Sequence, residues 1–107
     1  MSTIQLQMEG ELEAVRLVES YLDDRAWMSQ QVRVCLEVHD MFFQPTSSTV
    51  SPDGAHTSIQ WMMDGNFRDC QIFEKYFDDK LSRARSLTFK VHGRLVMLAP
   101  VRSWVDR

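Results

Sequence analysis

Hydrophobic residues near the start of the chain recur at steps of three and four positions. The residues that follow this spacing are Leu12, Val15, Val18 and Leu22. Charged residues fill most of the positions between them, so one side of the segment is apolar and the other is polar. This periodicity predicts an amphipathic helix over residues 11–24.

A second helical pattern follows the turn-forming residues Asp64, Gly65 and Asn66. Asn66 can cap a helix N-terminus, and the carboxylate of Asp69 is favourable near the positive end of the helix dipole. The stripe predicted to be buried consists of Cys70, Phe73, Phe77 and Leu81, with Phe67 and Tyr76 beside it. We expect this helix to end at about Arg83.

Between the two helices, apolar and polar residues alternate with a period of two. The clearest strand is predicted over residues 31–39. Residues 44–51 have a loop-like composition, and we expect only their second half, 47–51, to form a short strand. That strand is predicted to pair with residues 56–63 across the turn Pro52-Asp53-Gly54, because proline fixes φ and glycine tolerates a positive φ.

The same alternation returns after the second helix. Residues 87–91 and 94–99 are predicted to form a second hairpin around Gly93, and Pro100 is expected to end the pairing. Near the N-terminus, Ile4, Leu6 and Met8 alternate with glutamines, which indicates either a further strand or the first turns of the helix that follows.

This order of elements is α-β-β-β-α-β-β, with an extra N-terminal strand left open. It predicts an α+β fold with a largely antiparallel sheet of about five strands and two helices on one face. With the N-terminal strand, the order approaches a ferredoxin-like split βαβ arrangement. The chain of 107 residues is the size of one domain, so we expect a single globular domain over 1–107, with a loosely ordered tail over residues 101–107.

Composition is ordinary for a soluble domain, but the charge is divided along the chain. Residues 1–80 contain 14 acidic and 6 basic residues, a balance of −8, whereas residues 81–107 contain 1 acidic and 6 basic residues, a balance of +5. Such asymmetry is typical of a surface for a charged partner, of self-association, or of mutual attraction between the two ends.

The chain shows no secretion signal and no apolar run long enough for a membrane span, so we expect a cytoplasmic protein with no membrane partner. Its two cysteines, Cys35 and Cys70, lack zinc or CxxC spacing and are expected to be reduced thiols.

Candidate chemistry is sparse. Cys35, Glu37 and His39 would share one side of the predicted strand at steps of about 7 Å, too far for a direct Cys–His hydrogen bond. A small thiol enzyme centred on Cys35 is therefore the least favoured hypothesis. The histidines show no metal-binding spacing and no phosphate-binding glycine loop is present, so we expect no metal, no cofactor and no enzymatic activity.

Nucleic-acid binding is the second hypothesis. The residues that would carry it surround the C-terminal hairpin: Arg83, Arg85, Lys90, Arg94 and Arg102. The acidic body of the chain would repel a phosphate backbone, which makes this hypothesis weaker than protein binding.

The favoured hypothesis is a non-catalytic protein-binding module. Large apolar residues exceed what the core pattern requires, and the candidate anchors are Trp61, Met62, Trp104, Trp27 and Met28. Exposed tryptophan and methionine are typical of interfaces. We expect a small acidic inhibitor, immunity-type, anti-defence, chaperone or adaptor protein that docks to a partner protein, with a homodimer left open.

The order of helices and strands is similar to that of the dimeric class I type III secretion chaperones. The likeness is one of topology. It implies a chaperone-like, dimeric protein.

Overall fold

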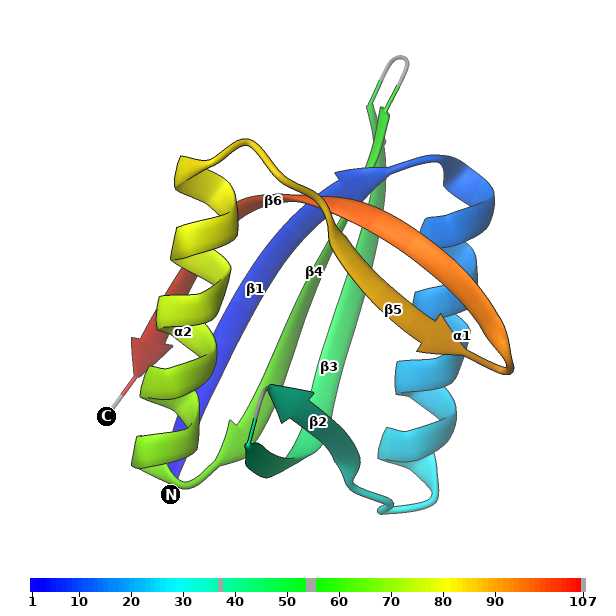
Figure 1. The fold of residues 1–107 in the computed structure, drawn as a ribbon. Helices are drawn as coiled ribbons and strands as arrows, with labels where there is room; N and C mark the ends of the chain where they lie inside the picture. Colours follow the sequence, from blue (N-terminus) through cyan, green and yellow to red (C-terminus); the bar gives the residue numbers. More distant parts are fainter. Residues whose placement is uncertain (37, 54–55, 107) are drawn as a thin grey trace.

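The computed structural model describes residues 1–36, 38–53 and 56–106. In chain order its elements are β1 (Ser2–Gly10), α1 (Leu12–Trp27), β2 (Val32–Leu36), β3 (His39–Asp53), β4 (His56–Gly65), α2 (Phe67–Ser82), β5 (Leu87–Val91) and β6 (Arg94–Asp106). The predicted α+β class is confirmed, and the N-terminal segment is a strand (Figure 1).

The described strands form one antiparallel sheet in the order β2-β3-β4-β1-β6-β5. β4 lies between β1 and β3 and is antiparallel to both, so β1 and β3 are parallel with one strand between them. This is the split βαβ connection that the alternative with an N-terminal strand predicted. The short strands β2 and β5 lie at the two edges of the sheet, which curls so that they stand over its inner face (Figure 1).

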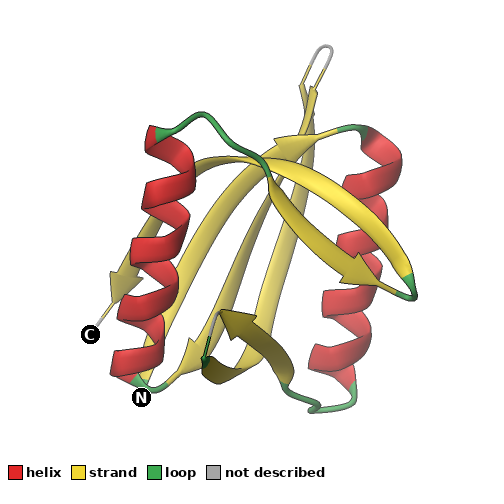
Figure 2. Cartoon of the chain, in the orientation of Figure 1, coloured by secondary structure: helices red, strands yellow, loops and turns green. Residues whose placement is uncertain are grey.

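Both helices pack on the same face of the sheet, one at each side, as predicted (Figure 2). The strand β1 shows how the sequence produces the two faces. Ile4, Leu6 and Met8 are fully buried in the core beneath the helices, whereas Gln5 and Gln7 point to the face that carries no helix. A period of two in the sequence thus becomes one apolar and one polar sheet face.

The helices begin and pack largely as their patterns predict. The side chain of Asn66 accepts a 2.8 Å hydrogen bond from the backbone N–H of Asp69, which caps α2. The residues that α2 buries are Cys70, Phe73 and Phe77. Leu81 does not belong to this stripe, since it is 40% exposed in the last turn of the helix.

The strand predicted over residues 31–39 is two strands. β2 ends at Leu36, and Leu36 already pairs with His39 of β3, so the chain reverses between them. Val38 follows the same alternation as Val32, Val34 and Leu36 in the sequence, but it is 92% exposed at this turn. Glu37 lies outside the described residues.

Residues 44–46 are also strand, not loop, and residues 47–51 are strand as predicted. They belong to β3, which pairs with β4 from Gln44 to Asp53, and the register shifts between Pro45 and Ser47. A bulge at this point accommodates Pro45, which has no N–H for a regular ladder. The predicted hairpin of β3 and β4 is confirmed, although Gly54 of its turn lies outside the described residues.

Residues 101–106 are the end of β6 and not a loose tail. They pair with the first half of β1, from Gln7–Arg102 to Thr3–Asp106. Pro100 does not end the pairing, because the register shifts beside it and the ladder continues. Arg107 lies outside the described residues.

Candidate docking surfaces

The helix-free face of the sheet holds two of the five anchors predicted from sequence. Met62 of β4 and Trp104 of β6 both pair with Gln5 of β1, so they lie in one row across the sheet, on either side of Gln5. Both side chains are partly exposed. Their neighbours on this face, Gln5, Gln7 and Gln60, are polar.

A neighbouring side chain of the same strand partly covers the indole ring of Trp104. The guanidinium of Arg102 lies 5.0 Å from the centre of the indole ring, and its Nε donates a 2.9 Å hydrogen bond to Gln7. The row around Trp104 is therefore already packed by neighbouring side chains, and it offers little contiguous apolar area.

Trp61, the third anchor, points the other way. It lies on the helix-covered face of β4 and is only 3% exposed, in the core cluster with Met63 and Phe73. Trp61, Met62 and Met63 follow one another in the sequence, and three consecutive residues of a strand cannot all share one face. The sequence did not say which of them faces inward, and Trp61 is not an exposed anchor in this structure.

Trp27 and Met28 lie at the C-terminal end of α1. They are 88% and 59% exposed, among the most exposed large apolar side chains of the described residues. Beside Trp27 is a shallow depression formed with Pro45 and Thr46 at the bulge of β3. These two residues are placed as an interface anchor requires.

Sequence analysis missed the most exposed apolar pair of the sheet. Leu95 and Met97 of β6 are 73% and 63% exposed, and they alternate with the buried residues Val96 and Leu98. The sequence signal was present in that alternation, because apolar residues fill both faces of this strand.

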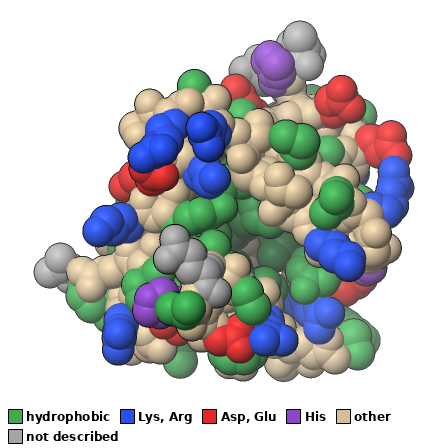
Figure 3. Space-filling model, viewed as in Figure 1, with side chains coloured by type: hydrophobic (Ala, Val, Ile, Leu, Met, Phe, Trp, Pro, Cys, Tyr) green, Lys and Arg blue, Asp and Glu red, His purple; other side chains and the backbone are tan. Residues whose placement is uncertain are grey.

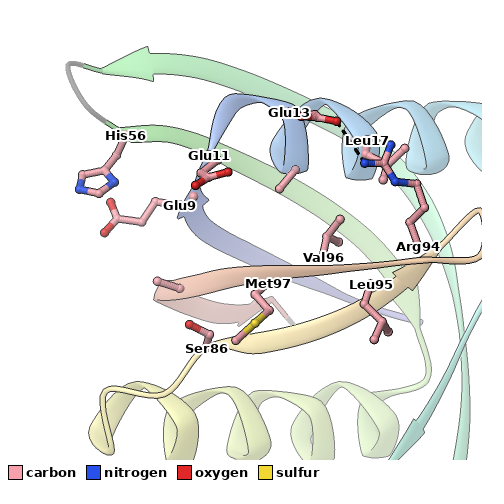
Figure 4. Close-up of a pocket in the computed structure, with 13 residues that line it drawn as sticks. Glu9, Glu11, Glu13, Leu17, His56, Ser86, Arg94, Leu95, Val96 and Met97 are labelled. Atoms are coloured by element: carbon pink, nitrogen blue, oxygen red, sulfur yellow. Dashed lines mark hydrogen bonds and ion pairs between the residues drawn. The ribbon is translucent and has the colours of Figure 1, made fainter.

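Leu95 and Met97 line an open groove of about 550 Å³ between α1 and β6 (Figure 4). Ala14 and Leu17 of α1 form its apolar far side. Three acids, Glu9, Glu11 and Glu13, lie along it near the junction of β1 and α1. We call this depression the acidic groove.

An ion pair crosses one end of the acidic groove. Arg94 Nη2 lies 3.1 Å from Glu13 Oε1, joining residues 81 positions apart, and His56 lies at the opposite end beside Glu9 (Figure 4). The pair is exposed, with more than 60% of each side chain accessible, so its contribution to stability is small. The pair does show that the C-terminal hairpin of β5 and β6 contacts the first turn of α1.

The basic residues proposed for nucleic-acid binding are divided among several parts of the fold. Arg83 follows α2 and pairs with Asp79 at 3.1 Å, whereas Arg94 pairs with Glu13 across the acidic groove. Arg102 lies on the helix-free sheet face. Arg85 and Lys90 are exposed, on the connection before β5 and on β5 itself. This arrangement does not form one continuous basic strip.

Cys35 sits in a cluster of three side chains at the β2–β3 hairpin. Asp40 receives two hydrogen bonds from Arg33, at 2.8 and 2.9 Å, and a third from the Cys35 thiol at 2.9 Å. The hydrogen bond to Asp40 raises the pKa of the Cys35 thiol, and the hydrogen bond from Arg33 lowers the pKa of Asp40. Cys35 is thus held as a thiol, the opposite of an activated nucleophile.

The other chemical candidates stay separate. His39 is exposed on β3, across the hairpin turn from Cys35 and not on the same strand. Within the described residues, no group of three or more His, Cys, Asp or Glu side chains could hold a metal ion. None of the described helices is long and apolar enough to cross a membrane.

Comparisons with known proteins identified no relative of this chain. No family model, no curated protein and no solved structure matches the chain. The likeness to secretion chaperones therefore rests on the order of elements alone.

Proposed function

We propose that the chain is a non-catalytic protein-binding module that docks a partner protein in the acidic groove. The observation that carries this proposal is the exposure of Leu95 and Met97 on an ordered strand beside α1. Large apolar side chains grouped in a groove favour burial against a partner, at about 25 cal/mol for each Å² removed from water.

The charge around the groove indicates the chemistry of the partner. Glu9, Glu11 and Glu13 border the apolar floor, and Arg94 is the one Lys or Arg side chain among the described residues that line it. A segment with apolar residues flanked by Lys or Arg would match this surface. The acidic side chains would raise the association rate of such a segment and favour it over acidic competitors.

Trp27 and Met28 are proposed as a second contact of the same partner or of another one, because both are exposed at the end of α1. We place the protein in the cytoplasm as part of this proposal. In support, Cys35 and Cys70 are both free and form no disulfide.

The test begins with affinity purification of the tagged chain from cells of its source organism. We expect a partner that is retained by the unaltered chain and by Leu81→Ser, which removes an exposed leucine from α2. The double variant Leu95→Ser/Met97→Ser should retain at most about a tenth of that partner, as expected for anchor residues.

Calorimetry with the recovered partner then tests the charge. Affinity should fall as sodium chloride rises, and Glu9→Lys/Glu11→Lys should weaken it further. Equal retention by the serine double variant would refute the proposal. So would light scattering that shows those serines only converting a homodimer to a monomer.

A further inference from the structure

A second depression lies on the other side of the β5–β6 hairpin, between the two edge strands β2 and β5. Its volume is about 370 Å³, within the range of ordinary ligand sites. Its floor includes Trp61 and Met63 of β4 and Phe73 of α2. Figure 3 shows hydrophobic side chains at the bottom of this hollow, near the centre of the face. We call it the β2–β5 hollow.

Both walls of the hollow are free edges of the sheet. β2 and β5 are the outermost strands, and each pairs with one neighbour only among the described strands. All five residues of each strand line the hollow, the inward-pointing and the outward-pointing ones alike. Each strand therefore meets the hollow with its backbone edge, where N–H and C=O groups are unpaired.

The turn that joins β5 to β6 determines which backbone groups of β5 are free. His92 and Gly93 both have positive φ, 50° and 78°, as in a two-residue type I′ hairpin turn. In such a turn the flanking residues, Val91 and Arg94, form a hydrogen-bonded pair.

Hydrogen-bonded and non-hydrogen-bonded pairs alternate along an antiparallel ladder. Leu87 and Phe89 therefore bond to β6, like Val91, whereas the N–H and C=O groups of Thr88 and Lys90 point away from it. These are the backbone groups that face the β2–β5 hollow.

The charge of the hollow is opposite to that of the acidic groove. Among the described residues, its charged lining residues are Arg33 and Lys90, and no acid is among them. Arg33 is engaged by Asp40, but Lys90 forms no ion pair with any described residue. On the floor, the buried Trp61 Nε1 has no hydrogen-bond partner in the described structure.

We propose that the β2–β5 hollow binds an extended acidic and apolar segment of a partner protein, which adds as a strand to the free edge of β5. The segment would pair with the backbone of Thr88 and Lys90. Its inward side chains would continue the apolar face of Phe89 and cover Trp61, and an outward acidic side chain would lie beside Lys90. This site is separate from the acidic groove and does not depend on it.

The probe is a fluorescent eight-residue peptide in which valine alternates with threonine and glutamate, and the readout is fluorescence anisotropy. Two analogues carry N-methyl groups on every second amide, in complementary patterns. A strand bound to one edge uses alternate amides. We expect one analogue to bind at least about 10-fold more weakly and the other to bind like the parent peptide.

Variants of the chain test the protein side. Lys90→Pro removes a backbone N–H that β6 does not use and should weaken peptide binding roughly 5- to 10-fold without unfolding the domain. Lys90→Glu keeps the N–H and reverses the charge, so it should weaken the glutamate peptide and strengthen one with lysine in its place. Lys75→Glu, on exposed α2, is the matched control and should change neither.

Equal binding of both N-methylated analogues would overturn strand addition, as would unchanged affinity in Lys90→Pro. Binding of decanoate with no binding of any peptide would overturn the choice of occupant, since it would show a small-molecule site. The variant Leu95→Ser/Met97→Ser should retain peptide binding, which separates this inference from the function proposed for the acidic groove.

Discussion

The β5–β6 hairpin has two edges of opposite electrostatic character: that of β5, and that of the start of β6, before its pairing with β1 begins at Ala99. Beside the β6 edge, Leu95 and Met97 line the acidic groove with α1, whereas on the β5 edge, Thr88 and Lys90 face an apolar hollow whose charged lining residues, among those described, are Arg33 and Lys90. One hairpin thus contributes to two different surfaces, the acidic groove on one side and the β2–β5 hollow on the other. A net charge of −3 conceals this separation, because opposite local charges cancel in the sum.

The hairpin can present both edges only if it is firmly held, and the largest predicted effect tests that. Leu98 is 1% exposed and packs so closely on Gly10 that a Cβ there would lie 2.7 Å from Leu98 Cδ2. Leu98→Ala should lower the free energy of unfolding by about 2–5 kcal/mol, measured by urea denaturation. Leu95→Ala, three positions away but exposed, should change it by less than about 0.5 kcal/mol. Similar losses in both variants would mean that the β6 edge is not a free surface.

A change in the turn between β5 and β6 should disturb both edges of the hairpin, with the second-largest expected effect. Gly93 has a φ of 78°, and no atom lies within 4 Å of the position of an added Cβ. Gly93→Ala should therefore cost about 1–2 kcal/mol through backbone strain alone, measured by thermal unfolding. Ser86→Ala, in the connection before β5, should leave the stability unchanged. A neutral Gly93→Ala would contradict the type I′ turn and the assignment of free groups built on it.

The reactivity of the Cys35 thiol on β2 distinguishes a binding protein from a thiol enzyme. Because the hydrogen bond to Asp40 raises the pKa of Cys35, iodoacetamide should react with it slowly, with a midpoint above the ordinary thiol value of 9.0. Asp40→Asn removes the carboxylate and leaves Arg33 nearby, so the pKa should fall and the rate at neutral pH should rise about 2- to 5-fold. Cys70 is fully buried and serves as the internal control. A fast rate in the unaltered chain would revive the thiol-enzyme hypothesis.

The smallest effect is expected at the ion pair that crosses the acidic groove. Glu13→Gln breaks the contact with Arg94, and it should change the free energy of unfolding by less than about 0.5 kcal/mol because both side chains are exposed. Urea denaturation at low and high salt measures this. A loss above 1 kcal/mol would show that the groove is closed by a structural contact and is not open to a partner.

Local patterns predicted the elements whose signals are themselves local. The stripe of Phe73 and Phe77 and the cap at Asn66 identified α2, and the glycine at position 93 identified the C-terminal hairpin. These features depend on residues within one or two turns of chain, so the sequence contains them directly.

The errors concern long-range pairing. Residues 44–46 and 101–106 are strand because β4 and β1 lie beside them, and neither partner is visible from their own composition. The same holds for the docking surfaces. Trp61 was chosen for its size, but β1 and β4 pair so that it faces the helices. Leu95 and Met97 alternate with the buried Val96 and Leu98, so they point away from the core.

The central place of β1 has a consequence for how the domain is made. Its neighbours in the sheet are β4 and β6, and a side-chain contact from Gln5 reaches Asp106, 101 positions later. During synthesis, β1 therefore waits with one edge unpaired until β6 has left the ribosome. Such distant pairing slows folding and leaves the backbone edge and the apolar face of β1 open to other chains. A nascent chain stalled before β6 should bind chaperones and aggregate, even though both helices are already complete.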